Sequence, residues 1–303
     1  MRIAVLTSGQ GWHMRELRRA AAALDCELLP VSWRQLLATV GLDDGDGLIG
    51  SEFDLRKVDR VLLRTIPAGS LEQIIFRMDA LQRLEAAGVP VVNPPRAMEA
   101  CCDKYLASAR LAAAGLCTPT TAACERRDEA MRAFDALDRD VVLKPLFGAE
   151  GKGITRITDP ELAYRAFQLL EHQGGVMYMQ RYIEHDHGDL RAFVLDGKVI
   201  AAMRRRGGDD WRANVSRGGS TESVELSAEQ GRLAVEAAAA LGALVAGVDL
   251  LPARDGRCYV LEVNAIPGWR GLTQATGVDV AAKVIEFLLA HQGGCDSHTV
   301  WFK

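Results

Sequence analysis

The sequence predicts an α/β protein made of several lobes, and three patterns support that fold class. Near the start, the apolar run Arg2–Leu6 is followed by a glycine-containing turn and by an amphipathic, Ala-rich helical pattern at 14–24. In the middle, a strand pattern at 140–144 precedes a Gly-rich turn and a helical pattern at 160–172. Toward the end, two apolar runs flank Asp255-Gly256, as in an antiparallel hairpin.

The chain of 303 residues, 49% hydrophobic, is long enough for two or three lobes. Apolar runs at 60–63 and 89–92 enclose a helical pattern of 3.6-residue period at 71–87, which indicates a small parallel α/β domain. Asn93-Pro94-Pro95 ends the last of these runs, because proline cannot continue a strand ladder. We therefore expect an N-terminal domain of residues 1–97, a central lobe of 98–180 and a C-terminal lobe of 181–303.

The two later lobes combine helices with antiparallel strands. One helix is expected over Met98–Ala114, because Gly115 is a typical stop signal. Strands at 190–195 and 198–204 should form a hairpin, since Asp196-Gly197 is a strong two-residue turn signal. A last helix is expected at 278–291.

Composition excludes several classes of protein. The net charge of -4 and the pI of about 5.9 leave no basic face for nucleic acid. The first residues form a strand pattern instead of a signal peptide, and no apolar run reaches the length of a membrane span, so a cytoplasmic location is expected. Seven Cys without a CxxC pair argue against a zinc site or a disulfide framework.

The most informative segment is VAGVDLLPARDGRCYVLEVNAIPG, residues 245–268. If Asp255 and Gly256 are a two-residue turn, then Asp249, six residues before it, pairs with Glu262, six residues after it. Asn264 lies on the same face by the strand period of two. Opposed carboxylates repel unless a cation lies between them, and oxygen ligands of this kind suit Mg²⁺. The alternative is that either acid lies on a wetter face or pairs with an Arg.

A second signal is VVLKPLFGAEGKGI, residues 141–154, in which Lys144 ends a strand and Gly148, Gly151 and Gly153 follow. Small residues let backbone N–H groups approach a phosphate chain, and the Lys supplies a positive charge for it. The alternative is a simple turn. GxxxxGK[ST] is absent here, and SGQGWH after the first strand breaks the GxGxxG pattern, so a P-loop and a Rossmann dehydrogenase are rejected.

With these residues in place, the chain resembles the ATP-grasp ligases, and among them the RimK-like glutamate ligases. The resemblance extends over nearly the whole chain in order and spacing, through Asn93, Asp103-Lys104, LAAAGLCTP, VVLKPLFGAEGKGI, MQRYIEHDHGDLRAFVLDGKVIAAMRRR, DWRANVSRGG, VAGVDLL and LEVNAIPGWRGLTQATGVDVA. It implies an ATP-grasp fold preceded by an N-terminal Rossmann-like pre-ATP-grasp domain. It also implies ATP between two lobes, a glycine-rich flap over the phosphates, and two Mg²⁺ ions, for which Mn²⁺ can substitute.

The resemblance assigns roles residue by residue. It implies that Lys104 and Lys144 contact phosphates beneath a flap that contains Gly148, Gly151 and Gly153, and that the backbone of Gln180, Arg181, Tyr182 and Ile183 meets adenine. It places Asp189 near the ribose, gives Arg212 and Asn214 a part in closing the phosphate site and in catalysis, and gives the metals to Asp249, Glu262 and Asn264.

The arginines near the Asp196-Gly197 hairpin are assigned by strand alternation and by the family register. Alternation puts Arg204 and Arg206 on one face and Arg205 on the other, and the family register favours Arg205 as the catalytic contact to the γ-phosphate or acyl phosphate. Arg191 lies two residues past Asp189 and shares its face, so a structural ion pair and direct catalysis are both open.

The implied activity is an ADP-forming ligation in which ATP phosphorylates a carboxylate and an amine then displaces the phosphate. The amine is expected to be L-glutamate. The acceptor is expected to be a pterin or deazaflavin coenzyme, because TIPAGSLEQIIFRMDALQRLE looks similar to the coenzyme-modifying branch, or else a protein C-terminus. Arg270 replaces an acid in a loop that often reads PGLEG in the family, which suits an anionic substrate. A phosphotransferase and a non-catalytic nucleotide-binding module are the alternatives, and the family implies a homodimer or homotetramer.

Overall fold

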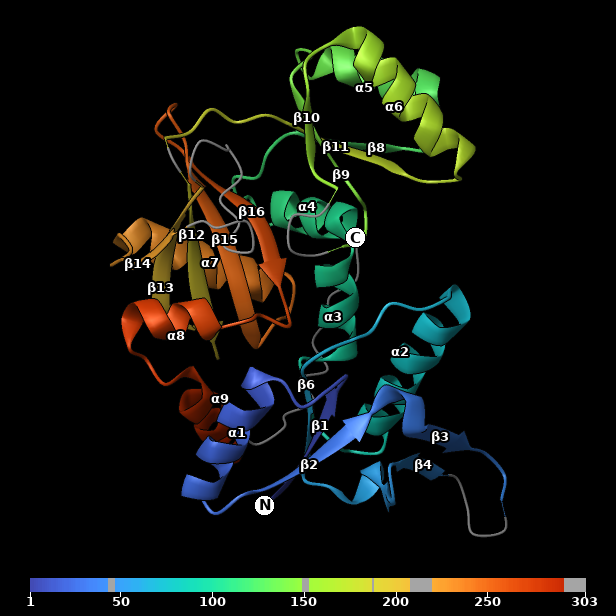
Figure 1. The fold of residues 1–303 in the computed structure, drawn as a ribbon, viewed down its shortest axis with the longest axis vertical. Coiled ribbons are helices and arrows are strands. Elements are labelled where there is room, and N and C mark those ends of the chain that lie inside the picture. The colour runs from blue at the N-terminus through green and yellow to red at the C-terminus, as the bar shows by residue number, and fades with distance from the viewer. Residues whose placement is uncertain (43–46, 149–152, 187, 208–219, 292–303) are drawn as a thin grey trace. The chain divides into compact units, whose positions relative to one another are not determined.

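The computed structural model describes residues 1–42, 47–148, 153–186, 188–207 and 220–291 (Figure 1). The chain divides into two compact units, of which unit 1 contains Met1–Pro95 and Asp279–Lys303 and unit 2 contains Arg96–Val278. Both units combine helices with sheets, so the predicted α/β class is confirmed. No helix in the described part of the chain is long and apolar enough to cross a membrane.

Unit 1 is built on a parallel sheet with the strand order β2-β1-β6-β7. Its strands are β1 (Arg2–Thr7), β2 (Glu27–Ser32), β6 (Arg60–Leu63) and β7 (Val91–Val92), and its helices are α1 (Trp12–Ala23), α2 (Leu71–Ala86) and α9 (Val280–Ala290). Residues Ile3 to Leu6 of β1 are almost completely buried, as expected of a central strand. α9 packs against α1, and Arg60 donates from Nε to the carbonyl of Leu288 at 2.7 Å.

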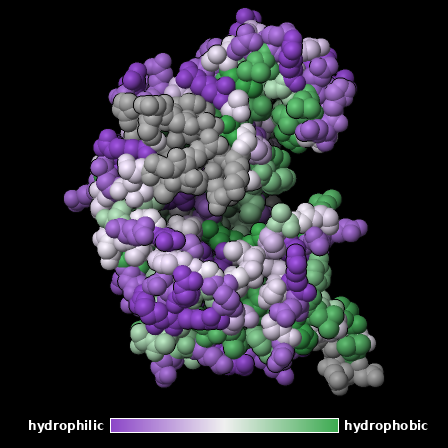
Figure 2. All heavy atoms as spheres, in the orientation of Figure 1, coloured by the Kyte–Doolittle hydropathy of each residue, from purple (hydrophilic) through white to green (hydrophobic). Residues whose placement is uncertain are grey.

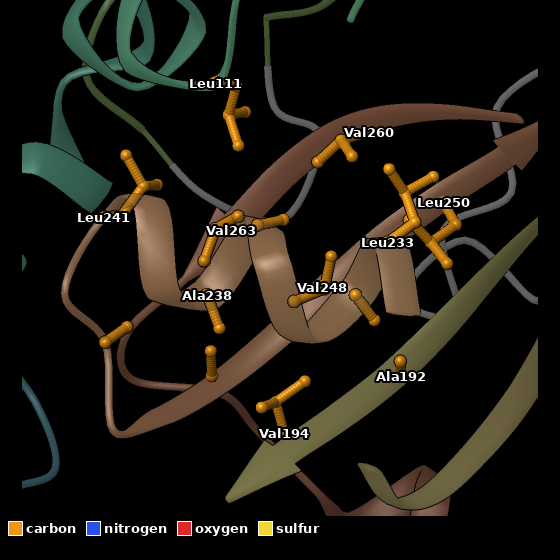
Figure 3. Close-up of a cluster of buried hydrophobic side chains, with 14 of the residues drawn as sticks. Leu111, Ala192, Val194, Leu233, Ala238, Leu241, Val248, Leu250, Val260 and Val263 are labelled. Carbon is orange, nitrogen blue, oxygen red and sulfur yellow. The ribbon is translucent and has the colours of Figure 1, made fainter. Parts of the chain in front are cut away.

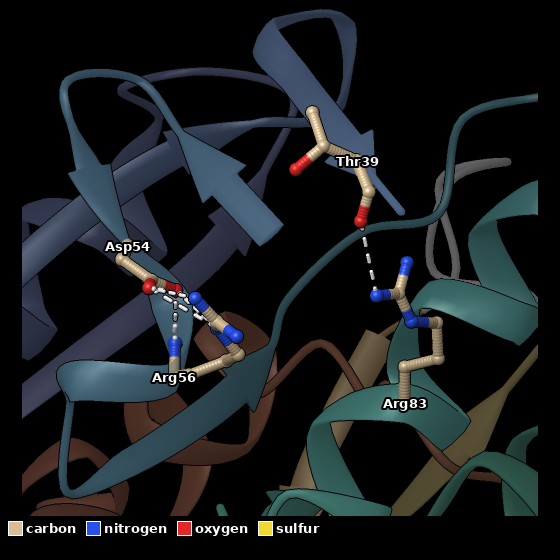
Figure 4. Close-up of polar contacts among 4 residues, drawn as sticks. All are labelled: Thr39, Asp54, Arg56 and Arg83. Carbon is tan, nitrogen blue, oxygen red and sulfur yellow. Dashed lines mark hydrogen bonds and ion pairs between the residues drawn. The ribbon is translucent and has the colours of Figure 1, made fainter. Parts of the chain in front are cut away.

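A small antiparallel sheet completes unit 1. It contains β3 (Leu36–Thr39), β4 (Gly47–Gly50) and β5 (Phe53–Asp54), and two 3₁₀ turns, Trp33–Gln35 and Leu55–Lys57, precede and follow it. Arg83 of α2 donates to the carbonyl of Thr39 at 3.3 Å, while Arg56 binds the carboxylate of Asp54 (Figure 4). The hydrogen bond from Arg83 therefore ties this sheet to α2.

Unit 2 begins with two helices where the sequence predicted one. α3 (Pro95–Cys102) and α4 (Lys104–Ala113) are separated at Asp103, which has an extended conformation with φ -89 and ψ 105. Its side chain accepts hydrogen bonds from the backbone N–H groups of Tyr105 and Leu106, so it caps a new helix. The prediction of a continuous helix over Met98–Ala114 was therefore wrong, because the N-cap signal of Asp103 outweighs the helical pattern around it.

The middle of unit 2 is an antiparallel sheet with the order β10-β9-β11-β8. Its strands are β8 (Thr121–Cys124), β9 (Val141–Lys144), β10 (Thr155–Ile157) and β11 (Met177–Arg181), and its helices are α5 (Arg127–Ala136) and α6 (Pro160–His172). Phe134 and Phe167 from the two helices meet edge to face at 6.4 Å in the core between the helices and the sheet. On the outside of this lobe apolar and hydrophilic residues are mixed (Figure 2), and Leu162 and Leu169 of α6 are exposed.

The remainder of unit 2 is a five-stranded antiparallel sheet with the order β14-β13-β12-β15-β16. Its strands are β12 (Asp189–Leu195), β13 (Lys198–Arg206), β14 (Ser220–Ser223), β15 (Val245–Pro252) and β16 (Cys258–Asn264), and its helices are α7 (Ala228–Ala240) and α8 (Arg270–Thr276). Leu233 and Ala238 of α7 pack on Ala192, Val248 and Val263 of the sheet (Figure 3). α7 thus covers the face of the sheet to which the even-numbered residues of β12 point. The opposite face, to which Asp189 points, carries the polar groups described below.

The three-part division into 1–97, 98–180 and 181–303 stays a prediction, but the structure differs from it in one respect. α9 belongs to unit 1, although it follows the C-terminal lobe in the sequence. Its buried residues, among them Val284, Ile285 and Leu288, need an apolar partner, and α1 provides one. A contiguous division of the sequence cannot anticipate such a return of the chain.

Candidate active site

The Asp249–Glu262 pair lies on the polar face of the C-terminal sheet, in the predicted register. The turn itself differs from the expected one. Ala253 and Arg257 close it through a 2.9 Å backbone hydrogen bond, which leaves three residues, Arg254 to Gly256, in the turn. A bulge at Leu261 then shifts the register back by one residue before Glu262. The predicted pairing is correct because these two deviations cancel.

The hairpin of β12 and β13 supplies the charged groups next to Asp249 and Glu262. Its turn is Asp196-Gly197, as predicted, with φ of 49° and 69°, and Leu195 pairs with Lys198. Arg205 lies opposite Asp189 and therefore shares its face, whereas Arg204 and Arg206 point to the other face and bind Glu222. The predicted alternation of the three arginines is thus observed.

Two aspartates and two arginines form a buried ion-pair layer on this face. Arg205 donates to both oxygens of Asp189 at 2.6 Å and also pairs with Asp249 at 2.8 Å. Arg191 binds Asp249 through Nε and through Nη2, the latter at 3.0 Å. Burial opposes the charge on Arg205, but Asp249 and Asp189 together raise its pKa above the ordinary value.

Lys144 faces this layer from the sheet of the central lobe. Its Nζ donates to Oε1 of Gln180 at 2.5 Å, and Nε2 of Gln180 donates in turn to Thr121 at 3.0 Å. Burial lowers the pKa of Lys144 to about 8, although the nearby carboxylates of Glu262 and Asp249 oppose this shift. Gln180 was predicted for its backbone, and its buried side chain as the partner of Lys144 was missed.

One pocket within unit 2 gathers most of the predicted residues. Among the residues that line it are Lys144, Gln180, Arg181, Tyr182, Ile183, Asp189, Arg205, Asp249 and Glu262. Pro119, Val142, Ile154, Leu251 and Leu261 add apolar walls. Apolar walls with a few convergent charges are typical of a site for a small molecule or a cofactor.

A match to a known family explains this arrangement. Residues 101–288 match the model of the RimK-like ATP-grasp domain. A tetrahydromethanopterin:alpha-L-glutamate ligase from Methanosarcina acetivorans is 35% identical over 265 residues, which cover 78% of this chain and 82% of that protein. The protein of the same name from Methanocaldococcus jannaschii is 38% identical over 222 residues, 71% of this chain and 75% of that protein.

The chain belongs to the RimK-like ATP-grasp family. The predicted membership and the predicted ADP-forming ligase class are thereby confirmed. The fold agrees with solved ATP-grasp structures. The ligase PsnB, complexed with a minimal precursor, has a TM-score of 0.75 at 23% identity, with 95% of this chain and 98% of that chain covered. D-alanine–D-alanine ligase from Bacillus anthracis, complexed with ATP, has a TM-score of 0.67 at 19% identity, with 95% and 96% covered.

The glycine-rich turn of this RimK-like chain lies against Lys104. Nζ of Lys104 donates to the carbonyl of Gly148 at 2.8 Å and to that of Leu146 at 3.5 Å. Gly148 and Gly153 have φ of 148° and 74°, which favour glycine. Gly151, Arg212 and Asn214 lie outside the described residues.

The oxygen groups on β15 and β16 fit a divalent cation of the kind that RimK-like proteins are expected to use. Glu262 is half-buried and makes no hydrogen bond or ion pair to another described residue. Asn264 accepts a hydrogen bond from the N–H of Ile266 at 2.9 Å through Oδ1, which has a second lone pair. Over the described ranges no three His, Cys, Asp or Glu side chains group as metal ligands, and the third predicted donor, Asn264, is an amide. Both oxygens of Asp249 also meet arginine, as the alternative interpretation expected.

Gly188 is a site residue that the sequence interpretation overlooked. It lines the pocket with φ of 113°, and a Cβ there would lie 1.9 Å from the carbonyl oxygen of Arg205. Only glycine permits β12 to begin this close to β13. Its position directly before Asp189 was the available signal.

Proposed function

We propose that this RimK-like protein uses MgATP to join L-glutamate to a carboxylate of a pterin coenzyme. The observation that carries the proposal is the convergence of Lys144, Asp189, Arg205, Asp249 and Glu262 in one pocket of unit 2. Residues 180–183, whose backbone is assigned to the base, line the same pocket. The residues thus provide separate places for a base, a phosphate chain and a cation.

The nucleotide roles follow from charge and position. Lys104 and Lys144 would bind phosphate oxygens beneath the glycine-rich turn with Gly148, Gly151 and Gly153. Asp189 would accept from a ribose hydroxyl, and the backbone from Gln180 to Ile183 would meet adenine. Arg205 would contact the transferred phosphoryl group, with Arg212 and Asn214 closing the site around it.

The cation roles are assigned to Asp249, Glu262 and Asn264. Mg²⁺ there would neutralise the charge that develops on the phosphoryl group. Three carboxylates, Asp189, Asp249 and Glu262, are balanced in the structure by Lys144, Arg191 and Arg205. Because ATP with two Mg²⁺ ions adds no formal net charge, we propose two ions, with Mn²⁺ as a substitute.

The reaction would have two steps. A carboxylate oxygen of the acceptor takes the γ-phosphoryl group and ADP leaves. The amine of glutamate then attacks the acyl carbon, phosphate departs and the amine loses a proton. No nucleophilic Ser or Cys is needed. The buried guanidinium of Arg205 and the ammonium of Lys144 would stabilise negative charge, and closing the glycine-rich turn over the pocket would keep water from the acyl phosphate.

The choice of acceptor rests on relatives. Three curated relatives named tetrahydromethanopterin:alpha-L-glutamate ligase are between 31% and 38% identical to this chain. We therefore propose tetrahydromethanopterin or a similar pterin as the acceptor. A homodimer or homotetramer in the cytoplasm remains our expectation for the assembled protein.

The test is incubation of the purified protein with MgATP, L-glutamate and tetrahydromethanopterin. We expect ADP, phosphate and a pterin that has gained one glutamyl residue, detected by mass spectrometry. A deazaflavin coenzyme and a peptide with a free C-terminus serve as competing acceptors. ADP formation without consumption of glutamate would indicate a phosphotransferase instead, and absence of ADP with every acceptor would contradict the ligase proposal.

A further inference from the structure

The two arginines of the ion-pair layer both pair with carboxylates through Nε and Nη2. Arg205 uses these atoms on the two oxygens of Asp189, and its Nη2 also pairs with Asp249. Arg191 donates to Asp249 from Nη2 and forms an ion pair with it through Nε, and its Nη1 makes no hydrogen bond to any described residue. The side chain of Arg191 is only 13% exposed. It therefore presents a fixed, nearly buried cation with one end of its fork still able to donate.

The free end of Arg191 occupies space left by a glycine. A Cβ on Gly247 would lie 2.4 Å from Nη1 of Arg191 and 2.9 Å from Cβ of Pro267. Gly247 pairs with Asn264 across the hairpin, and Arg191 pairs with Asp249. Nη1 therefore lies over β15, beside the groups to which the cation roles are assigned.

Arg191 also lies just beyond the nucleotide pocket. Asp189 lines the pocket, whereas Arg191 does not, although it follows on the same face about 7 Å further along the strand. Phe193 comes next on this face and meets Trp269 edge to face at 6.1 Å. A ligand group that lies between the part of the pocket assigned to the phosphates and the Phe193–Trp269 pair would contact Nη1 of Arg191. In a ligase, the group that must lie next to the phosphate end is the carboxylate to be phosphorylated.

We propose that Arg191 binds the reacting carboxylate of the acceptor, and that Gly247 is required because it leaves room for this guanidinium. The inference rests on the ligase function proposed above. Nη1 donates to the carboxylate oxygen that does not react, while the other oxygen forms the new bond to phosphorus as the bond to ADP breaks. Because Asp249 holds the rest of the guanidinium, the donor is in position before the acceptor arrives.

The experiment compares Arg191→Lys, Arg191→Met and Gly247→Ala with the wild-type enzyme, using tetrahydromethanopterin, L-glutamate and MgATP. Arg204→Lys is the matched control, because its guanidinium lies on the opposite face of the same sheet. We expect the KM for the pterin to rise about 10- to 100-fold in the three variants, the loss of one hydrogen bond to a charged group. In Arg191→Lys and Gly247→Ala, which keep the positive charge beside Asp249, the KM for MgATP and the dissociation constant of MgADP should stay within about threefold, the usual variation between such measurements.

The double variant Arg191→Met/Gly247→Ala tests the link between the two residues. If Gly247 acts by making room for Arg191, the alanine adds nothing to the methionine variant. If the alanine costs as much in that background as in the wild type, it acts through Pro267 and the role of Gly247 is refuted. Equal rises in the KM for pterin and for MgATP, or a fall in kcat alone, would overturn the role of Arg191.

Failure of the proposed function gives a different result. If the wild-type enzyme leaves the pterin unchanged, a panel of carboxylic acids is incubated with MgATP and hydroxylamine, which traps acyl phosphates as hydroxamates. An acid that yields hydroxamate then replaces the pterin in the comparison of the variants with the wild-type enzyme. In that case only the assignment of the pterin as acceptor is refuted. If no acid yields hydroxamate, Arg191 has no carboxylate to hold and both proposals fall.

Discussion

At the scale of single residues, the lowered pKa of Lys144 predicts how activity depends on pH. Burial lowers its pKa to about 8, so the free enzyme loses this positive charge as the pH rises through that value. We expect kcat/KM for MgATP, which reports ionisations of the free enzyme, to fall about tenfold for each pH unit above 8. A profile from pH 6.5 to 9.5 measures this fall.

The control for this profile is Lys144→Arg, whose side chain stays charged throughout the range. Its kcat/KM can be lower at every pH, but the fall that begins near pH 8 should disappear. A fall at the same pH in the variant would assign the ionisation to another group. The same shift affects stability, because the unfolded chain binds this proton more tightly. The cost of the buried charge is present below pH 8 and disappears as the pH rises toward 10.5.

Arg270 makes a second prediction at this scale. It is exposed at the first position of α8, next to the buried Trp269, on the polar side of the sheet. Arg270→Glu should raise the KM for an anionic acceptor about tenfold and leave the KM for MgATP unchanged, because one attractive charge becomes repulsive. Arg232→Glu, on α7 at the other face of the sheet, is the control and should change neither. Equal effects of Arg270→Glu on both substrates would contradict the prediction.

At the scale of secondary-structure elements, the sequence predicted the face on which each strand side chain lies better than it predicted the geometry of the turns. Asp249, Glu262, Asp189 and Arg205 were placed on their faces by a period of two, which holds as long as a strand is extended. The bulge at Leu261 could not be predicted, because it depends on how two strands twist together. It happened to cancel the extra turn residue, so Asp249 and Glu262 were paired correctly on an incorrect premise.

Contacts between elements were harder to predict. Alternation along β12 indicated that Arg191 shares the face of Asp189, but not that it reaches across to Asp249 on β15. The side-chain bond from Lys144 to Gln180 joins two strands whose pairing only the fold specifies. The break at Asp103 was visible as a capping residue, yet the apolar pattern around it favoured one helix.

Gly188 tests the start of β12. Gly188→Ala should destabilise the protein and weaken MgADP binding at least tenfold, because the Cβ would lie 1.9 Å from the carbonyl oxygen of Arg205 and would push Asp189 and Arg205 apart. Gly197→Ala is the control, since φ there is also positive but no atom lies within 4 Å of the added Cβ. It should cost only about 1–2 kcal/mol of backbone strain and leave MgADP binding unchanged. Calorimetry of unfolding and of MgADP binding measures both, and similar affinities in the two variants would contradict the prediction.

At the scale of the whole molecule, the sequence order and the compact units do not coincide. The chain builds most of unit 1, then all of unit 2, and returns with α9 to unit 1. The residues that line the proposed nucleotide pocket all belong to unit 2. Stability of unit 1 and nucleotide affinity should therefore be separable by mutation.

A pair of core variants tests this separation. Ile285 of α9 and Phe167 of α6 are both fully buried, in unit 1 and unit 2 respectively. Either residue replaced by Ala should cost about 2–5 kcal/mol, because a cavity remains. In urea denaturation we expect Ile285→Ala to lower a transition that MgADP does not stabilise, since a ligand stabilises only the part that binds it. Phe167→Ala should lower the transition that MgADP raises. A single transition that both variants lower and MgADP raises equally would instead mean that the units unfold as one, and that α9 couples the two ends of the chain to the nucleotide site.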